Sequence, residues 1–136
     1  STITRVSSGD IAIEGNTIFR AGTRILENEV VLTGATTVAL DALLGNTFKL
    51  TSSGNFSIQA PTNKPASGQV QKIVIAHEAS LADRTLTLHT STAGSFRFGT
   101  DITALTATSC GVYDYIGCIY NDADDRWDVV SYIKGF

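Results

Sequence analysis

Apolar and polar residues alternate with a period of two along several stretches of the chain. Phe48 and Leu50 alternate with polar residues over 47–51, and Phe56 and Ile58 do the same over 55–59. Such alternation is typical of strands with one buried face. The short Ser52-Ser53-Gly54 segment between the two stretches therefore predicts a hairpin whose strands share one buried face.

Two later stretches repeat this pattern. Leu86 and Leu88 alternate with threonine and histidine, while Trp127, Val129 and Ile133 alternate with charged residues. Side chains at every second position of a strand share one face. We expect these five apolar residues to meet in the core.

Two further strands, predicted over 70–76 and 112–120, are apolar on both sides. A sheet with one solvated face does not require this, so the pattern indicates that something covers their outer face. Another copy of the chain is the simplest cover, and we expect a homotrimer. The predicted subunit contacts are Tyr113, Tyr115 and Tyr132, the last placed by alternation on the face opposite Trp127.

Helical signals are weak. Threonine is abundant, and its branched Cβ suits a pleated sheet. Single turns are conceivable at 40–44, ending at Gly45, and at 78–83, but both are too short to organise a fold. The prediction is an all-β, antiparallel, jelly-roll-like sandwich with a short-stranded N-terminal arm.

The first 34 residues differ from the rest, because short apolar pairs are separated by glycine and polar residues. Gly15-Asn16 is a plausible hairpin turn. We predict an anchoring arm over 1–34 and the sandwich over 35–136, although the same segment would also suit edge strands of the sandwich. The predicted shell-binding residues of the arm are Ile11, Ile13, Ile18, Phe19, Ile25 and Leu26.

Composition and charge argue against two classes of binding partner, nucleic acids and membranes. The net charge is −3, the basic residues are scattered singly, and the C-terminal segment is acidic, which argues against nucleic-acid binding. No apolar run reaches the roughly 18 residues that span a bilayer, so no membrane partner is expected. The start lacks a secretory signal pattern, and synthesis in a host cytoplasm is the expectation.

No metal or cofactor site is predicted. Cys110 and Cys118 are too few for a zinc site or a disulfide scaffold, and buried free thiols are expected. The Asn121–Asp125 segment gathers oxygen ligands that calcium prefers, but it lacks the spacing of a calcium loop. A plain turn explains it better, because Asx side chains bond the nearby backbone.

No catalytic residues are predicted either. His77 lies at the end of its predicted strand without the second histidine of a zinc-protease motif, and His89 is expected to be exposed or at an interface. Glycoside hydrolysis would need paired carboxylates, such as Glu27 with Glu29 or Asp124 with Asp128. Such closely spaced pairs are more often solvated charges, which makes an enzyme the third hypothesis.

The order of several short motifs resembles a small β-domain of tailed-bacteriophage virion proteins, often found at the C-terminus of tail-fibre or other structural proteins. The resemblance covers about the last hundred residues. It implies a virion location and carries no catalytic residues to transfer. The matching stretches are Leu40–Phe48, Asn55–Asn63, Gly68–Gln71, Arg84–Thr87, Phe96–Gly99, Asp114–Tyr120 and Arg126–Phe136.

The first hypothesis is therefore a capsid decoration or cement protein, bound as a trimer to the major capsid protein on the outer shell. Members of this family that act as fibres carry the domain on a long shaft, whereas about 34 residues precede it here. Aromatic side chains would also suit sugar binding, with Tyr113, Tyr115, Tyr120, Trp127 and Tyr132 as candidates. The alternative hypothesis is accordingly a tail-associated module that binds a host surface receptor or glycan.

Overall fold

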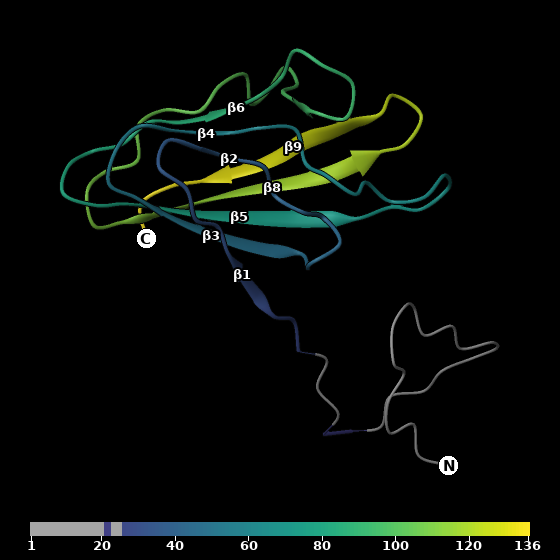
Figure 1. Ribbon diagram of the computed structural model, residues 1–136, viewed down its shortest axis with the longest axis horizontal. Helices are drawn as coiled ribbons and strands as arrows, with labels where there is room; N and C mark the ends of the chain where they lie inside the picture. Colours follow the sequence, from purple (N-terminus) through teal and green to yellow (C-terminus); the bar gives the residue numbers. More distant parts are fainter. Residues whose placement is uncertain (1–20, 23–25) are drawn as a thin grey trace.

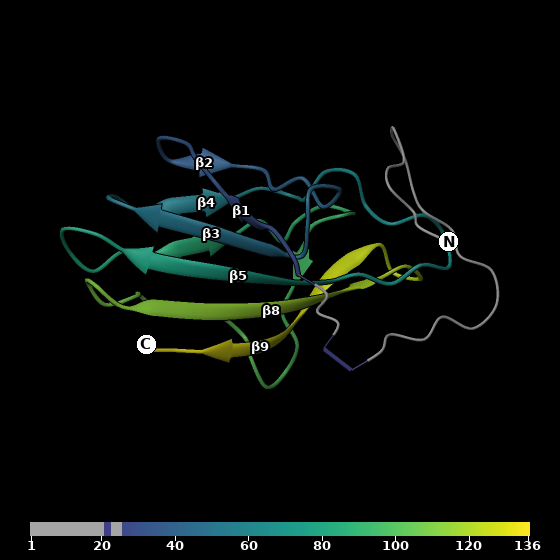
Figure 2. The ribbon, with the colours of Figure 1, turned by 90° about the horizontal axis from the view of Figure 1, so that it is seen from below.

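The computed structural model describes residues 21–22 and 26–136, which are all-β and contain no helix. No segment of this part of the chain is therefore a helix able to cross a membrane. Nine strands in this part of the chain form two sheets, a mixed sheet of six strands in the order β1-β3-β5-β8-β9-β7 and a parallel sheet of three in the order β2-β4-β6. The two sheets form two layers (Figures 1 and 2). The strands are β1 (Glu29–Val31), β2 (Thr37–Val38), β3 (Thr47–Ser52), β4 (Phe56–Ile58), β5 (Lys72–Ala79), β6 (Leu86–Leu88), β7 (Phe96–Arg97), β8 (Tyr113–Asn121) and β9 (Arg126–Ile133).

The first six strands alternate between the two sheets. Strands β1, β3 and β5 pair in parallel in the larger sheet, and β2, β4 and β6 pair in parallel in the smaller one. The chain therefore winds from layer to layer instead of folding back on itself. The prediction of antiparallel pairing is wrong for this half of the fold. A jelly-roll-like arrangement, which is built from antiparallel strands, is not confirmed.

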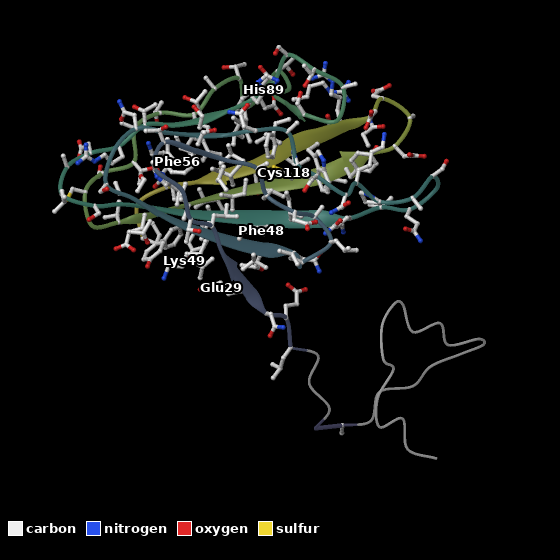
Figure 3. The ribbon with its side chains drawn as sticks, in the orientation of Figure 1. Glu29, Phe48, Lys49, Phe56, His89 and Cys118 are labelled. Atoms are coloured by element: carbon white, nitrogen blue, oxygen red, sulfur yellow. The ribbon has the colours of Figure 1, made fainter. Side chains whose placement is uncertain are left out.

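The predicted hairpin between β3 and β4 is also wrong. Both strands bury alternate apolar side chains as expected, namely Phe48 and Leu50 from β3 and Phe56 and Ile58 from β4. They belong to different sheets, however, and their apolar faces meet across the core (Figure 3). Alternation determines which face of a strand is buried, but it does not determine which strand lies alongside.

Antiparallel pairing is found where β8 joins β5 on one side and β9 on the other. The acidic segment after Asn121 connects β8 and β9 as a hairpin. Its register shifts at Gly117 and Cys118, where Val130 is the extra residue of a β-bulge. A bulge reverses the side-chain alternation beyond it. Ile133 therefore lies on the outer face, 55% exposed, and not in the core as alternation alone predicted.

A single core cluster fills the space between the sheets. Trp127 and Phe48 are buried there together with Leu86 and Leu88 from the smaller sheet, as predicted, and Phe96 joins them. Burying a large apolar side chain stabilises a fold by about 1.5–3 kcal/mol, so this cluster is the main source of stability. The core uses only the inner face of the six-stranded sheet.

Neither conceivable helical turn is present. After Leu40 the chain makes a tight turn in which the backbone N–H of Leu44 bonds to the carbonyl of Asp41 at 3.1 Å. The side-chain amide of Gln71 donates to the carbonyls of Ala42 and Gly45 and holds this turn against β5. Residues 78–83 instead finish β5 and bend away from it.

The N-terminal segment is described only in part. Glu29–Val31 supplies an edge strand to the larger sheet, and Leu32 is buried in the core, as the edge-strand interpretation of this segment expects. Among the predicted shell-binding residues, Leu26 is strongly exposed. The others, Ile11, Ile13, Ile18, Phe19 and Ile25, lie outside the described residues, as does the Gly15-Asn16 turn.

Candidate functional sites

The outer face of the six-stranded sheet, which points away from the smaller sheet, carries an unusual number of apolar side chains. Strand pairing places Val31, Lys49, Ala76, Tyr115 and Ile133 in one row across five strands. Val31, Tyr115 and Ile133 are exposed large apolar residues. Exposed apolar patches of this kind mark interaction surfaces in soluble proteins.

Aromatic side chains gather at one end of this face. The rings of Tyr113 and Tyr115 stack with centroids 6.4 Å apart, and Phe136 meets Tyr115 edge-on at 5.6 Å. Phe136 is 64% exposed but held in place, because its backbone N–H and carbonyl both bond to Tyr113, at 3.0 and 2.7 Å. We call Tyr113, Tyr115 and Phe136 the aromatic cluster.

A charged rim surrounds the aromatic cluster. The ammonium of Lys49 lies 5.2 Å from the Tyr113 ring centroid, and hydrogen bonding to Tyr113 raises the pKa of Lys49. Next to it, the hydroxyl of Thr51 donates to the carboxylate of Glu78 at 3.3 Å. Figure 3 shows Lys49 and Glu29 on the side of the molecule away from the smaller sheet. The arrangement has the composition of a binding surface, with apolar rings and a polar border.

The three tyrosines predicted as subunit contacts are therefore separated. Tyr113 and Tyr115 lie together on the outer face, but Tyr132 does not, because the bulge turns its ring toward the core. Its hydroxyl donates to the carbonyl of Thr106 at 3.1 Å and accepts the N–H of the same residue at 3.2 Å. The predicted face of Tyr132 is wrong. Among the sugar-binding candidates, Tyr120 and Trp127 are buried.

A buried chain of polar side chains, which sequence reasoning missed, lies at the same end of the molecule. Ser52 Oγ lies 2.7 Å from His77 Nε2, and His77 Nδ1 lies 2.9 Å from Thr108 Oγ1. The Thr108 hydroxyl in turn donates to Asp114 Oδ2 at 2.7 Å. The exposed fractions of Ser52, His77, Thr108 and Asp114 are 2%, 0%, 2% and 1%. We call these four residues the buried polar chain.

The hydrogen positions in this chain follow from the carboxylate. Thr108 gives its only proton to Asp114, so its oxygen must accept one from His77 Nδ1. His77 Nε2 is then without a proton and accepts from the Ser52 hydroxyl. Burial lowers the pKa of His77, with the charge of Asp114 acting against this, and the neutral ring fits the assignment. Every bond in the chain thus runs toward Asp114.

Serine, histidine and aspartate also form hydrolytic triads, but this chain is built differently. A threonine stands between His77 and Asp114, and the Ser52 hydroxyl is buried in the core. A nucleophile must reach its substrate, so Ser52 in this conformation cannot act as one. Asp114 instead also accepts the backbone N–H of Gly135 at 2.9 Å. The buried polar chain therefore anchors the C-terminal residues that carry Phe136.

No local motif could have revealed this chain, because its members come from β3, β5, a loop and β8. His77 was predicted at the end of a strand, yet it lies inside β5, where it pairs with Leu50 of β3, and Ser52 lies two residues farther along β3. The only available signal was Asp114 among apolar residues on the inward-facing positions of its strand. Buried carboxylates require partners, and the sequence does not say which.

A cluster of charged side chains lies at the turn between β8 and β9, separate from the charged residues around the aromatic cluster. The guanidinium of Arg97 donates to Asp128 at 2.7 and 3.0 Å and to Asp124 at 3.0 Å. Hydrogen bonds from Arg97 lower the pKa of Asp128. Asp125 takes the Tyr120 hydroxyl at 2.8 Å and pairs with Lys64 at 3.1 Å.

These pairings concern two hypotheses considered from the sequence, a calcium site in the Asn121–Asp125 segment and glycoside hydrolysis by paired carboxylates. Within 26–136, no three His, Cys, Asp or Glu side chains gather in a way that could hold a metal ion. Asp124 and Asp128, considered above as a carboxylate pair, share one arginine. Glu29 lies exposed on an edge strand. Asn121 Oδ1 accepts the N–H of Asp124 at 3.2 Å, as expected for an Asx turn.

The two cysteines differ from the prediction that both are buried. Cys118 is buried on the inner face, and its burial raises the pKa of the thiol to about 12. Cys110 is exposed. His89 is half-buried, with Ser91 and Thr92 near its ring.

Two of the surface depressions lie along β6 and beside β1. One of about 310 Å³ runs along β6 and is lined by Leu86, Leu88, Phe98 and Leu105. Another, of about 390 Å³, lies beside β1 and includes Val31 and Lys49. Both volumes fall at the low end of small-molecule sites.

Comparisons with protein-family models, with curated proteins and with solved structures each found no match to this chain.

Proposed function

We propose that this chain is a structural protein of a bacteriophage virion, which assembles as a homotrimer and binds the outside of the capsid shell as a decoration or cement protein. The observation that carries the proposal is the apolar outer face of the six-stranded sheet. The opposite face of that sheet already forms the core. The exposed apolar residues of the outer face are therefore free to bind a partner.

The size of this face suits self-association. The six strands contain 36 residues, and at about 3.3 Å per residue and about 4.8 Å between strands their outer face covers roughly 600 Å². Specific protein interfaces bury about 600–1,000 Å² on each partner, and this face reaches the lower end of that range. Lys49 and Lys72 share the face with Glu29 and Glu78, so a second copy offers opposite charges as well as apolar contacts.

The virion location rests on the resemblance of the sequence motifs to phage structural proteins. The major capsid protein is the proposed partner. A trimer would present three copies of any weak contact with the shell, and linked contacts gain effective concentration over a single one. The function proposed here is adhesion.

A second candidate, glycan or receptor binding by a tail-associated module, is favoured by the aromatic cluster. Exposed aromatic rings pack against apolar ligand faces, while Lys49 and Glu78 supply polar contacts at the border. The two candidates use the same surface. They differ in whether its partner is protein or carbohydrate.

A mass measurement tests self-association. For the purified chain, light scattering should give about three times the monomer mass of 14.4 kDa. Tyr115→Lys and Ile133→Lys, which place charge in the exposed apolar row, should reduce it to the monomer. Ser53→Lys, which adds the same charge in an exposed loop, should leave the mass unchanged. A monomeric unmodified protein at tens of micromolar would overturn the proposed trimer.

Copy number then distinguishes shell from tail. Quantitative mass spectrometry of purified particles should find the chain in numbers comparable with the major capsid protein if it decorates the shell. A few copies per particle would favour the tail-associated candidate. In that case binding of host surface glycans to the protein, and its loss in Tyr115→Ala, becomes the deciding measurement.

A further inference from the structure

Strand β6 leaves one edge of the three-stranded sheet open. The N–H of Phe56 bonds to the carbonyl of Thr85 at 3.0 Å, and the N–H of His89 bonds to the carbonyl of Ile58 at 2.9 Å. In a parallel pair such bonds involve every second residue, so the N–H and C=O groups of Leu86 and Leu88 face away from β4. Across 26–136, no backbone partner for these groups is found on that side.

A groove follows this open edge. Arg84 and Thr108 exchange two backbone hydrogen bonds, at 3.0 and 2.8 Å, as if an antiparallel neighbour began there. The chain from 98 to 107 then separates from β6. The resulting depression of about 310 Å³ is lined by Leu86, Leu88, Phe98, Thr103, Ala104 and Leu105. Its lining comes from β6 on one side and from residues 98–105 on the other.

The edge of β6 also lacks the features that keep exposed strands from pairing. Natural edge strands are protected by charged residues, proline or bulges. The two edges of the larger sheet carry Glu29 on β1 and Arg97 on β7, whereas β6 reads Leu-Thr-Leu. An unprotected strand beside an apolar groove is typical of a site for strand addition.

We propose that the groove along β6 receives residues 10–14, Asp-Ile-Ala-Ile-Glu, of a neighbouring copy as a fourth strand. Ile11 and Ile13 are spaced to lie beside Leu86 and Leu88 and to cover Phe98 and Leu105, with Ala12 beside Thr87. The acidic ends of this five-residue segment complement Arg84 at one end of β6.

We assign this segment to a neighbouring copy because the chain enters the fold at the other layer, so its own β6 could be reached only by a segment that crosses the molecule. Residues before 29 lead into β1, at the edge of the larger sheet, while β6 belongs to the other layer (Figure 1). Glu29 of β1 and His89, next to β6, lie on opposite sides of the molecule (Figure 3). The inference rests on the proposed self-association and adds a second link between subunits.

Disulfide trapping tests this placement. Two full-length chains with different affinity tags, both carrying Cys110→Ser, are co-expressed, one with Ala12→Cys and the other with Thr87→Cys. Paired residues on adjacent strands bring their Cβ atoms to within disulfide range. Mild oxidation should give a linked dimer containing both tags. A linked peptide joining 12 to 87 in mass spectrometry identifies it.

Thr37→Cys is the matched control. Thr37, Ser57 and Thr87 form one row across the smaller sheet, so Thr37 occupies the same row and face at the opposite edge. Trapping with Thr87→Cys should exceed trapping with Thr37→Cys at least tenfold, and Ile11→Asp with Ile13→Asp should remove the difference. Equal yields would overturn the inference. So would internal 12–87 links when both cysteines are in one dilute chain. If trapping fails while the trimer mass persists, only this inference fails, not the proposed trimer.

Discussion

Strand β8 begins in one polar cluster and ends in another, and the two are opposites in their surroundings. At its start, Asp114 is almost inaccessible and is bonded to Thr108 and Gly135. At its end, Asn121 joins Asp124, Asp128 and Arg97 at the solvent-facing turn. Both clusters use carboxylates and hydrogen bonds of similar length. Water reaches one of them and not the other.

Burial determines how much each cluster contributes to stability. A surface ion pair is screened and gives up little when it is broken, because water replaces the lost partner. A buried donor that loses its acceptor has no such replacement and retains the full cost of its desolvation. The start of β8 should therefore control whether the fold is stable, while its end should only adjust the geometry of the hairpin.

The largest expected effect is that of Asp114→Ala. It leaves the buried Thr108 hydroxyl without its acceptor and removes one of the two acceptors of the Gly135 N–H, which keeps the carbonyl of Tyr113 at 3.2 Å. We expect a loss of about 3 kcal/mol in the free energy of unfolding. Urea denaturation followed by tryptophan fluorescence measures it. Asp124→Ala, at the exposed end of β8, is the matched control and should cost under about 1 kcal/mol. Equal losses for the two variants would show that burial is not the deciding difference.

The next effect is the pH dependence that His77 introduces. Burial lowers its folded-state pKa below the ordinary value of 6.5, so the unfolded chain takes up the proton first as the pH falls. Stability should be complete above about pH 7 and decline toward pH 5, by up to about 1.4 kcal/mol per pH unit. The charge of Asp114, which raises the pKa of His77, limits the decline.

His77→Gln supplies the control for this decline. Glutamine keeps hydrogen-bonding atoms but does not titrate, so the variant should be less stable than the unmodified protein and should show a flatter profile between pH 7 and 5. The lowered pKa values of Asp125 and Asp128 act below about pH 4, outside this window. An unchanged slope in His77→Gln would assign the pH dependence to other groups.

Only those features of the fold that follow from the alternation of apolar and polar residues could be predicted from the sequence. The buried positions of β3, β4 and β6 follow from their period of two, and so does the burial of Trp127. The parallel winding of the first six strands could not be predicted, because alternation carries no information on which strands are neighbours. The bulge at Val130 was equally hidden. One extra residue there moved Ile133 to the outer face and Tyr132 toward the core.

The candidate sites also divide into features that one strand reveals and features that depend on how several strands pair. Tyr113 and Tyr115 were predicted as subunit contacts on a strand with two apolar faces, which is a local property, and both lie on the outer face. The buried polar chain joins residues up to 62 positions apart and depends on the register between three strands and a loop. The contact of Phe136 with Tyr115 depends in turn on that chain, through Gly135. Neither the buried polar chain nor the Phe136–Tyr115 contact can be recognised from a short segment of the sequence.

The smallest effect is expected at the exposed end of β8. Arg97→Met keeps much of the side-chain stem but removes the guanidinium that holds Asp128 through two bonds and Asp124 through one. Because the arginine side chain is 40% exposed, we expect a loss of only about 0.5–1 kcal/mol in the free energy of unfolding.

Salt separates the charge of Arg97 from its packing. At about 1 M salt the screening length falls to about 3 Å, so the difference between Arg97→Met and the unmodified protein should shrink in parallel denaturation curves. The cost of Asp114→Ala should change less under the same conditions, because the Asp114 carboxylate and the Thr108 hydroxyl are buried, and its one charged partner, Lys134, lies 3.8 Å away. A loss at Arg97 that is as large as that at Asp114 and insensitive to salt would mean that the hairpin turn is part of the folding core. The contrast between the two ends of β8 would then lie in their sequence and not in their energetics.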